Sequence, residues 1–246
     1  MTGTDAFQWT SAGITDVGKI RKVNEDAFTD RPEQGLWVVA DGMGGHAAGD
    51  FASQAIVESL GQVGKHDRLS LFIDEVEDRL LKVNQALIDE AVSREETTTI
   101  GSTVVALLAV NNYCACLWVG DSRAYRLRGG QMTPVSQDHS QVEELIEQGM
   151  LLREDAEAHP AANVITRAVG ADEQLFVDVE LVELQDGDRF LLCSDGLFKE
   201  VSEAEIAEHM QRGSCQELCH DLIELTLERG SRDNVTVVAV DFNKVQ

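Results

Sequence analysis

The order of predicted strands and helices constrains the fold of this chain more than any other feature. Short apolar runs predict strands near residues 7–17, 35–40, 102–110, 113–119, 123–128, 175–182, 188–194 and 234–241. Helical patterns appear in two pairs, first near 47–60 and 73–87, then near 202–211 and 214–228. Because strands and helices do not alternate one for one, the order predicts an α+β fold with two packed sheets covered by helices.

Two local patterns support the predicted helices. The second helical segment carries an apolar stripe at three- and four-residue steps, typical of a helix with one buried face: Ile73, Val76, Leu80, Val83 and Leu87. Ser202 and Ser214 stand just before the late helical patterns, where hydroxyl side chains favour helix N-caps.

Charge and composition limit the partners of the chain. Its 20 Lys and Arg face 44 Asp and Glu, a formal net charge of −24. Nucleic acids and anionic membranes bind through basic residues, so neither is expected as a partner.

We see no signal peptide, membrane span or linker, and expect one cytoplasmic domain over residues 1–246 without a membrane anchor. The 5 cysteines show no CxxC spacing, which favours buried free thiols.

Four aspartates stand at the ends of predicted strands. Three predicted strands end at an aspartate: Asp41 in "LWVVADG", Asp121 in "ACLWVGDSR" and Asp195 in "RFLLCSDG". The fourth aspartate, Asp233, directly precedes the predicted strand "NVTVVAV". A carboxylate beside a buried strand is costly unless it is paired or bound to a metal. We therefore expect these side chains to converge at one edge of the core. All-oxygen ligands select Mg²⁺ or Mn²⁺ rather than zinc.

The stretch "TDVGKIRKVNEDAF" adds further charged residues to this edge. A hairpin leading to Asp41 would bring Glu25 and Asp26 close to it. Clustered carboxylates need a countercharge, for which the candidates besides a metal are Arg21, Arg123, Arg167 and Arg232. The planar fork of Arg21 also suits a phosphate.

The glycines after Asp41 do not indicate a nucleotide site. Gly42, Gly44 and Ala47 satisfy the loose dinucleotide fingerprint. That fingerprint needs a second strand ending in an acidic residue roughly 20 residues on, and helical patterns follow instead. Asp41 would also repel a pyrophosphate, and no Gly-Lys-Ser/Thr is present for a P-loop.

The chain resembles a known family over nearly its whole length, from about residue 10 to 241. The motifs that carry the resemblance occur in this order: "TDVGKIRKVNEDAF", "VVADGMGGHAAGDFAS", "TTTIGSTVVALL", "LWVGDSRAYRLR", "QDHSQVEELIEQG", "HPAANVITRAVG", "LLCSDGLF" and "RDNVTVVAV". They resemble the bacterial branch of the metal-dependent, type 2C serine/threonine protein phosphatases (the PPM family). The resemblance implies a four-layer αββα sandwich of two antiparallel sheets flanked by helix pairs, with a small flap near residues 136–170.

The resemblance also implies a binuclear Mn²⁺ or Mg²⁺ centre and a site for a third, weaker ion. The metal residues implied are Asp41, Gly42, Asp195, Asp233, Glu25, Asp26 and Asp121. Asp41 would bridge two ions, and the Gly42 carbonyl would bind one. How Glu25 and Asp26 divide their task stays open, and the third ion would use Asp121 together with Asp195.

The reaction implied is hydrolysis of phosphoserine and phosphothreonine on proteins. A metal-bridging water would attack phosphorus, Arg21 would hold the phosphate oxygens, and His46 would protonate the leaving alkoxide. Such a phosphatase would act as a monomer on phosphorylated proteins and oppose a cognate Ser/Thr kinase.

One departure and two alternatives accompany this hypothesis. Relatives often carry basic residues where this chain has Ala161 and Ala162, which predicts weaker capture of phosphopeptides by the flap. A phosphatase-like binding module is one alternative, against which stand the intact residues Asp41, Asp195, Asp233 and Arg21. A hydrolase of small phosphate esters or nucleotides is the other.

Overall fold

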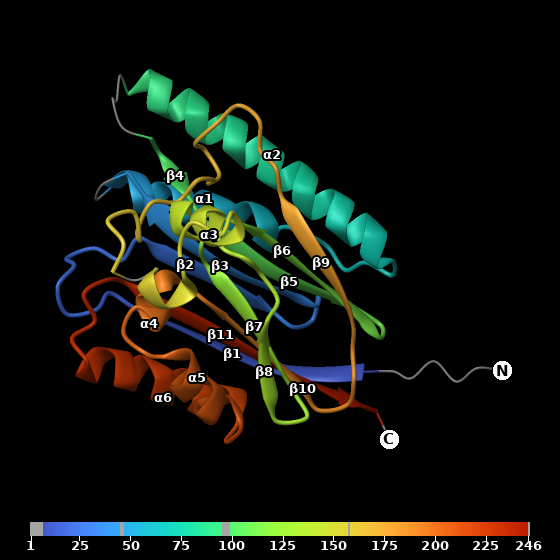
Figure 1. The fold of residues 1–246 in the computed structure, drawn as a ribbon. Helices are drawn as coiled ribbons and strands as arrows, with labels where there is room; N and C mark the ends of the chain where they lie inside the picture. Colours follow the sequence, from blue (N-terminus) through green and yellow to red (C-terminus); the bar gives the residue numbers. More distant parts are fainter. Residues whose placement is uncertain (1–6, 45–46, 95–98, 157, 246) are drawn as a thin grey trace.

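Two antiparallel sheets pack face to face in this chain (Figure 1). The structure is a computed structural model that describes residues 7–44, 47–94, 99–156 and 158–245. The β1 sheet has the order β1 (Phe7–Asp16), β11 (Val235–Lys244), β10 (Asp188–Cys193), β7 (Arg123–Arg128) and β8 (Gln131–Pro134). The β3 sheet has the order β2 (Asp26–Arg31), β3 (Leu36–Met43), β5 (Val104–Val110), β6 (Tyr113–Val119) and β9 (Asp178–Glu183), with β4 (Gly101–Ser102) paired to β3.

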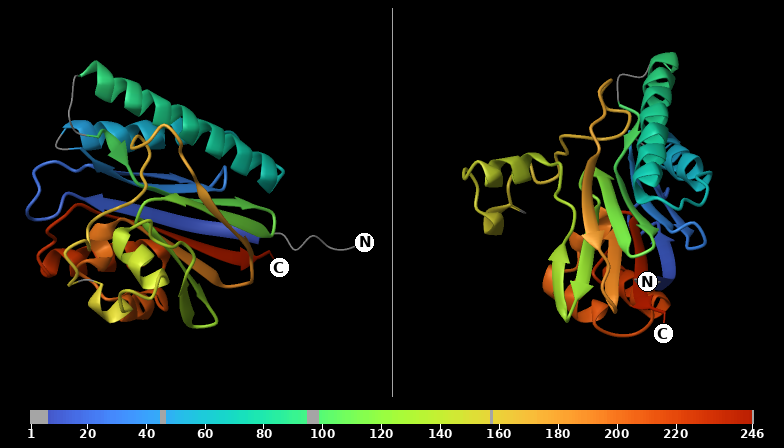
Figure 2. Two further views of the ribbon diagram at one scale, coloured as in Figure 1. Left: turned by 45° about the horizontal axis from the view of Figure 1, so that its top comes forward. Right: turned by 90° about the vertical axis from the view of Figure 1, so that its right-hand side faces the viewer.

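Helices cover the outer face of each sheet (Figures 1 and 2). The pair α1 (Ala47–Gly61) and α2 (Leu69–Ser93) lies on the β3 sheet, and the pair α5 (Glu203–Met210) and α6 (Cys215–Glu228) lies on the β1 sheet. The short helix α4 (Asp195–Phe198) follows β10 directly. These layers confirm the predicted αββα sandwich.

Three apolar clusters hold the layers together. Trp37, Phe190 and Phe242 are fully buried between the sheets, where their rings meet edge to face. A second cluster lies between the β3 sheet and its helices, and a third between the β1 sheet and its helices. Strand β3 is buried from Leu36 to Ala40 on both faces because it is covered by α1 on one side and by the β1 sheet on the other.

The predicted helix features are confirmed. The apolar stripe of α2 is buried from Val76 to Leu87, with Ile73 packed against the same cluster. Ser214 caps α6 by accepting the backbone N–H of Glu217, and the Glu217 carboxylate accepts the Ser214 backbone N–H in return. All five cysteines are buried free thiols, as predicted. No helix among the described residues has the length and apolar character that a membrane crossing requires.

The strands differ from the prediction in four places. No residue range was predicted for β2, which only the expected hairpin implied, and β8 was not predicted, because both are short and rich in polar residues at a sheet edge. The predicted strand 102–110 divides at Thr103 into β4 and β5. At this break the Thr103 backbone N–H donates to the Asp41 carbonyl at 2.9 Å. The predicted strand 175–182 begins later, at Asp178.

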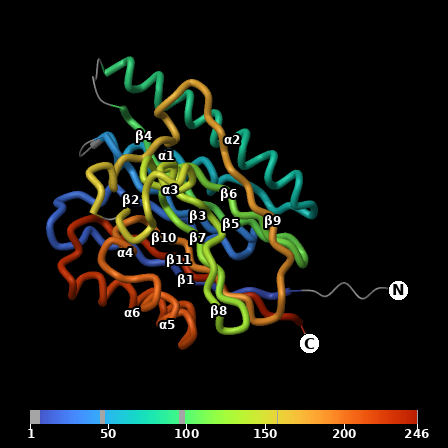
Figure 3. The backbone as a smooth tube through the Cα atoms, in the orientation of Figure 1, coloured from blue at the N-terminus to red at the C-terminus, as the bar shows by residue number. Residues whose placement is uncertain are grey.

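The segment between β8 and β9 leaves the sheets and returns to them (Figures 2 and 3). It contains α3 (Gln141–Glu147) and a single 3₁₀ turn (Arg153–Asp155). On its return Val169 forms an isolated antiparallel bridge with Ser102, beside β4. The segment therefore stands next to the end of β3, where Asp41 lies.

Candidate active site

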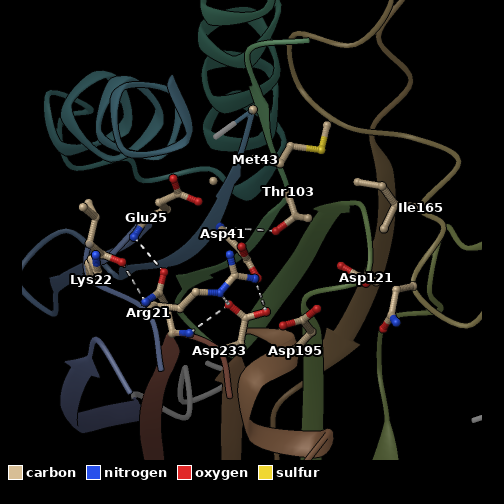
Figure 4. A pocket seen from close by; sticks show the side chains of 15 residues that line it. Arg21, Lys22, Glu25, Asp41, Met43, Thr103, Asp121, Ile165, Asp195 and Asp233 are labelled. Carbon is tan, nitrogen blue, oxygen red and sulfur yellow. Dashed lines mark hydrogen bonds and ion pairs between the residues drawn. The ribbon is translucent and has the colours of Figure 1, made fainter. Parts of the chain in front are cut away.

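A pocket of about 370 Å³ opens where β3, β6 and β10 end and β11 begins (Figure 4). Its charged lining residues include Arg21, Glu25, Asp41, Asp121, Asp195 and Asp233. The four strand-end aspartates therefore converge at one edge of the core, as their positions in the sequence predict.

Asp41 is held by backbone and hydroxyl contacts to the neighbouring strand. Its backbone N–H donates to Thr103 Oγ1 at 3.3 Å. Its carbonyl accepts from the Thr103 N–H and from Ser102 Oγ, each at 2.9 Å. The Asp41 carboxylate is therefore carried on a fixed stretch of backbone at the pocket wall.

Gly42, the next residue, allows three segments to meet. A Cβ atom at this position would lie 2.0 Å from the Gly49 carbonyl oxygen and 2.6 Å from that of Glu25. Both obstacles are backbone atoms, so α1 approaches β3 this closely only because residue 42 is glycine. The Gly42 N–H also donates to the Glu25 carbonyl at 3.0 Å, which fixes Glu25 beside the pocket.

Asp26 lies behind the pocket wall. Strands β2 and β3 form the expected hairpin, and their register places Asp26 opposite Asp41. Ser194 Oγ and Thr236 Oγ1 donate to Asp26 Oδ2 at 2.7 and 2.8 Å. The other oxygen, Oδ1, is buried and accepts no hydrogen bond. Asp26 therefore has one buried oxygen without a hydrogen-bond donor.

Two cations from the chain contact the pocket carboxylates. The Arg21 guanidinium pairs with Asp233, with Nε–Oδ1 at 3.0 Å and Nη2–Oδ2 at 3.1 Å (Figure 4). Lys199, one helical turn beyond Asp195, donates to Asp195 Oδ2 and lies 3.9 Å from Asp233 Oδ2. The other candidate arginines, Arg123, Arg167 and Arg232, pair instead with Asp138, Asp178 and Glu200.

These contacts leave the cluster short of positive charge. Burial raises the pKa of Asp26 and of Asp121 to about 7, and neighbouring carboxylates add to both shifts. Burial also raises the pKa of Asp41 and Asp195, in Asp195 against the opposing effect of Lys199. Every shift has the same physical cause, since desolvated carboxylates that repel one another favour the protonated form.

The donor chemistry of this cluster fits hard divalent cations. Carboxylate and carbonyl oxygens are the ligands that Mg²⁺ and Mn²⁺ prefer. The buried Oδ1 atoms of Asp26 and Asp195 accept no hydrogen bond, so each has a lone pair available for an ion. In the described part of the chain, no three acidic, histidine or cysteine side chains are grouped closely enough to enclose one ion. Arg21 and Lys199 instead pair with two of the carboxylates.

The remaining predicted residues lie as follows. His46, the candidate general acid, falls outside the described residues. Asn163 and Ile165 line the pocket, so the segment that follows Ala161 and Ala162 forms part of its wall. That placement agrees with the expected position of the flap beside the site.

Sequence reasoning missed two residues that shape the site. Lys199 was overlooked, although its spacing of four residues from Asp195 would have indicated a contact if a helical turn had been predicted there. Asn234 was missed as well. Its Oδ1 accepts the Glu25 N–H, and its Nδ2 donates to the carbonyls of Val17 and Val23. Asn234 thereby fastens the loop that carries Arg21 and Glu25.

The chain is similar to known proteins over most of its length. Residues 20–224 match the family model described as Protein phosphatase 2C. The serine/threonine phosphatase stp of Listeria innocua is 38% identical over 240 residues, 94% of this chain and 95% of that protein. Serine/threonine protein phosphatase PstP of Mycobacterium tuberculosis is 35% identical over 94% of this chain and 44% of its own length.

Solved structures show the same fold. PppA of Pseudomonas aeruginosa, described as a key regulatory component of T6SS, superposes with a TM-score of 0.89 at 43% identity, covering 97% of this chain and 98% of that one. The catalytic domain of PstP, solved in complex with two manganese ions, gives a TM-score of 0.85 at 33% identity, covering 97% and 100%.

Proposed function

The chain belongs to the protein phosphatase 2C family and is a serine/threonine protein phosphatase; on that premise, we propose that its acidic pocket hydrolyses phosphoserine and phosphothreonine with bound Mn²⁺ or Mg²⁺. The observation that carries the proposal is the convergence of Asp41, Asp195 and Asp233 around a pocket in which the buried Asp195 Oδ1 has no donor. Such a cluster calls for divalent cations.

We assign the ions to the residues that the family resemblance implies. The proposed ligands are Asp41, the Gly42 carbonyl, Asp195 and Asp233, with Glu25, Asp26 and Asp121 nearby. When bound, divalent ions increase the acidity of water and offset the negative charge of a phosphoryl group. The hydroxyls of Ser194 and Thr236 hold Asp26 in place beside Asp41 through two hydrogen bonds.

Arg21 is the proposed phosphate-binding residue. Its side chain is 51% exposed at the pocket, and its fork already binds a carboxylate of Asp233 in the geometry that suits a phosphate. In the proposal, Asp233 binds a metal ion. Arg21 then releases the Asp233 carboxylate and binds two oxygens of the substrate phosphate instead. The guanidinium then neutralises charge that develops in the transition state.

His46 remains the candidate for the general acid. It follows Asp41 by five residues, so it is close in sequence to the pocket wall. In the proposal, it donates a proton to the departing serine or threonine oxygen. Its test is the alkaline limb of the pH–rate profile for a substrate with a poor leaving group, because a general acid loses its function when it is deprotonated.

The biological setting is proposed from the relatives. PppA is described as a regulatory component of a secretion system, and several relatives are named serine/threonine phosphatases. We infer that this chain opposes a bacterial Ser/Thr kinase in the cytoplasm. Phosphoproteomics of a deletion strain would identify the substrates as phosphosites whose occupancy rises.

One assay tests the proposed chemistry. Turnover of a phosphothreonine peptide and of p-nitrophenyl phosphate is measured with Mn²⁺, with Mg²⁺ and with EDTA, for the wild type, Asp195→Ala and Asp78→Ala. Asp78 is exposed on α2, away from the pocket, and provides a matched control. We expect metal-dependent turnover that Asp195→Ala abolishes and Asp78→Ala retains.

The other outcomes discriminate between the alternatives. Equal turnover in EDTA would contradict the metal mechanism. Turnover of p-nitrophenyl phosphate without turnover of any phosphopeptide would favour a hydrolase of small esters. No turnover of either substrate, with Mn²⁺ bound, would favour a binding module.

A further inference from the structure

Lys199 lies beside the acidic pocket and contacts two of its carboxylates, and the proposed reaction does not use it. It is the C-cap of the one-turn helix α4, which begins at Asp195. Residues four apart on a helix lie on the same face, so the turn directs Lys199 back onto the Asp195 carboxylate. The lysine side chain is one-third exposed, whereas Asp195 is nearly buried.

The backbone around α4 holds this lysine close to a second carboxylate. A Cβ atom on Gly196 would lie 1.9 Å from the Asn234 carbonyl oxygen. The first turn of α4 therefore packs directly on the chain that follows Asp233. As a consequence, Lys199 Nζ reaches Asp195 Oδ2 and also lies 3.9 Å from Asp233 Oδ2.

The two carboxylate oxygens of Asp195 have different surroundings. Oδ2 accepts from Lys199, and Oδ1 is buried without a donor. Asp195 can thus give one oxygen to a divalent ion while the other stays on the lysine. Asp121 also lies near enough for the Lys199 charge to act on it. Within the described residues, no lysine or arginine forms an ion pair with Asp121.

We propose that the Lys199 ammonium serves as a built-in cation on the Asp121 side of the centre, where it takes the place of one divalent ion. This inference rests on the proposed metal centre. An ammonium group is monovalent and fixed to the chain, so it can neutralise Asp195 Oδ2 whatever the concentration of divalent ions. The chain then binds fewer divalent ions than its carboxylates alone would hold.

The test counts bound ions and does not depend on activity. The full chain is stripped with EDTA, dialysed, and titrated with Mn²⁺, and bound and free Mn²⁺ are measured by EPR and by calorimetry. Wild type is compared with Lys199→Met, which removes the charge, and with Lys199→Arg, which keeps it. Lys22→Met is the matched control, because Lys22 lines the pocket and, among the described residues, forms no ion pair with Asp195.

We expect Lys199→Met to bind one more Mn²⁺ per chain than the wild type, while Lys199→Arg and Lys22→Met bind the wild-type number. Circular dichroism verifies that each variant is folded, and Lys199→Gln replaces the methionine variant if the latter does not fold. An unchanged number and affinity of Mn²⁺ in the uncharged variants would overturn the inference and leave an ordinary helix ion pair. If Mn²⁺ binds neither wild type nor variants, the proposed metal centre itself is contradicted, and the inference with it.

Discussion

Asp26 lies directly opposite Asp41 in the β2–β3 hairpin, so two carboxylates that belong to one acidic cluster are cross-strand neighbours. Like charges in this position repel each other and destabilise the pair of strands. Ser194 and Thr236 stabilise one oxygen of Asp26, and the other oxygen has no donor. The ion-free protein therefore retains this repulsion in its folded state.

The first prediction concerns the ion-free stability. Asp26→Asn keeps the acceptor for the two hydroxyls and places an amide where the unsatisfied oxygen was. Because burial raises the pKa of Asp26 from 3.8 to about 7, the carboxylate is ionised and costly at alkaline pH. In EDTA at about pH 8 we expect the variant to be more stable by about 1 kcal/mol or more, since one pKa unit corresponds to about 1.4 kcal/mol.

Urea unfolding of wild type and variant measures this difference. With saturating Mn²⁺ the wild type should be the more stable protein, because the variant lacks a negative charge that strengthens the binding of the ions. Asp67→Asn, at an exposed position before α2, is the control and should change neither measurement. A variant that is less stable in EDTA would mean that Asp26 is not a source of repulsion.

The second prediction concerns the close approach at Gly42. In Gly42→Ala, the new methyl group would meet the carbonyl oxygens of Gly49 and Glu25, and neither can move without displacing backbone. We expect a loss of about 3 kcal/mol or more in unfolding free energy. Gly64→Ala is the matched control, because nothing lies within 4 Å of a Cβ there, and it should change stability by less than about 0.5 kcal/mol.

A thermal scan with and without Mn²⁺ completes this comparison. The Gly42 variant should also gain less from Mn²⁺, because the displaced backbone carries the proposed carbonyl ligand. Equal stabilities of the two alanine variants would show that α1 and β3 can separate freely at this point.

Much of this architecture could be predicted because burial leaves a clear pattern in the sequence. Asp41 and Asp195 each follow an apolar strand, and an aspartate at such a point stands out against its neighbours. Lys199 gave no such signal. Its contact with Asp195 depends on a single helical turn, which is too short to show any periodicity.

The segment between β8 and β9 was equally hard to predict in detail. Its internal contacts are polar pairs ten residues apart, Gln137 with Glu147 and Arg153 with Glu143. A hydrophobic pattern does not encode such pairs. The family resemblance implied a flap near residues 136–170, and its placement beside the pocket required the structure.

The third prediction uses the pH dependence of a buried histidine in this region. His139 Nδ1 accepts the Gly120 backbone N–H at 3.1 Å, so the neutral ring carries its proton on Nε2, 3.1 Å from Asp178 Oδ2. Burial lowers the pKa of His139, against the opposing effect of Asp178. The unfolded chain therefore binds a proton at a higher pH than the folded chain, and stability falls as pH drops below about 6.5.

His139→Gln removes this proton linkage. Wild type should lose stability relative to the variant between about pH 7 and pH 5, with a slope of at most about 1.4 kcal/mol per pH unit. Denaturant unfolding at several pH values, with His220→Gln on the exposed face of α6 as control, measures the difference. Parallel pH profiles for wild type and His139→Gln would contradict a lowered pKa.

The last prediction concerns substrate capture by the flap. Ala161 and Ala162 directly precede Asn163, which lines the pocket, so side chains at these positions are close to a bound phosphopeptide. Replacing both alanines by arginine should lower the KM for an acidic phosphopeptide roughly two- to fivefold, as expected for exposed ion pairs worth about 0.5–1 kcal/mol. The effect should shrink in high salt, because exposed charges are screened. Replacing both by glutamine controls for size. An unchanged or raised KM in the arginine variant would show that the flap does not contact the peptide.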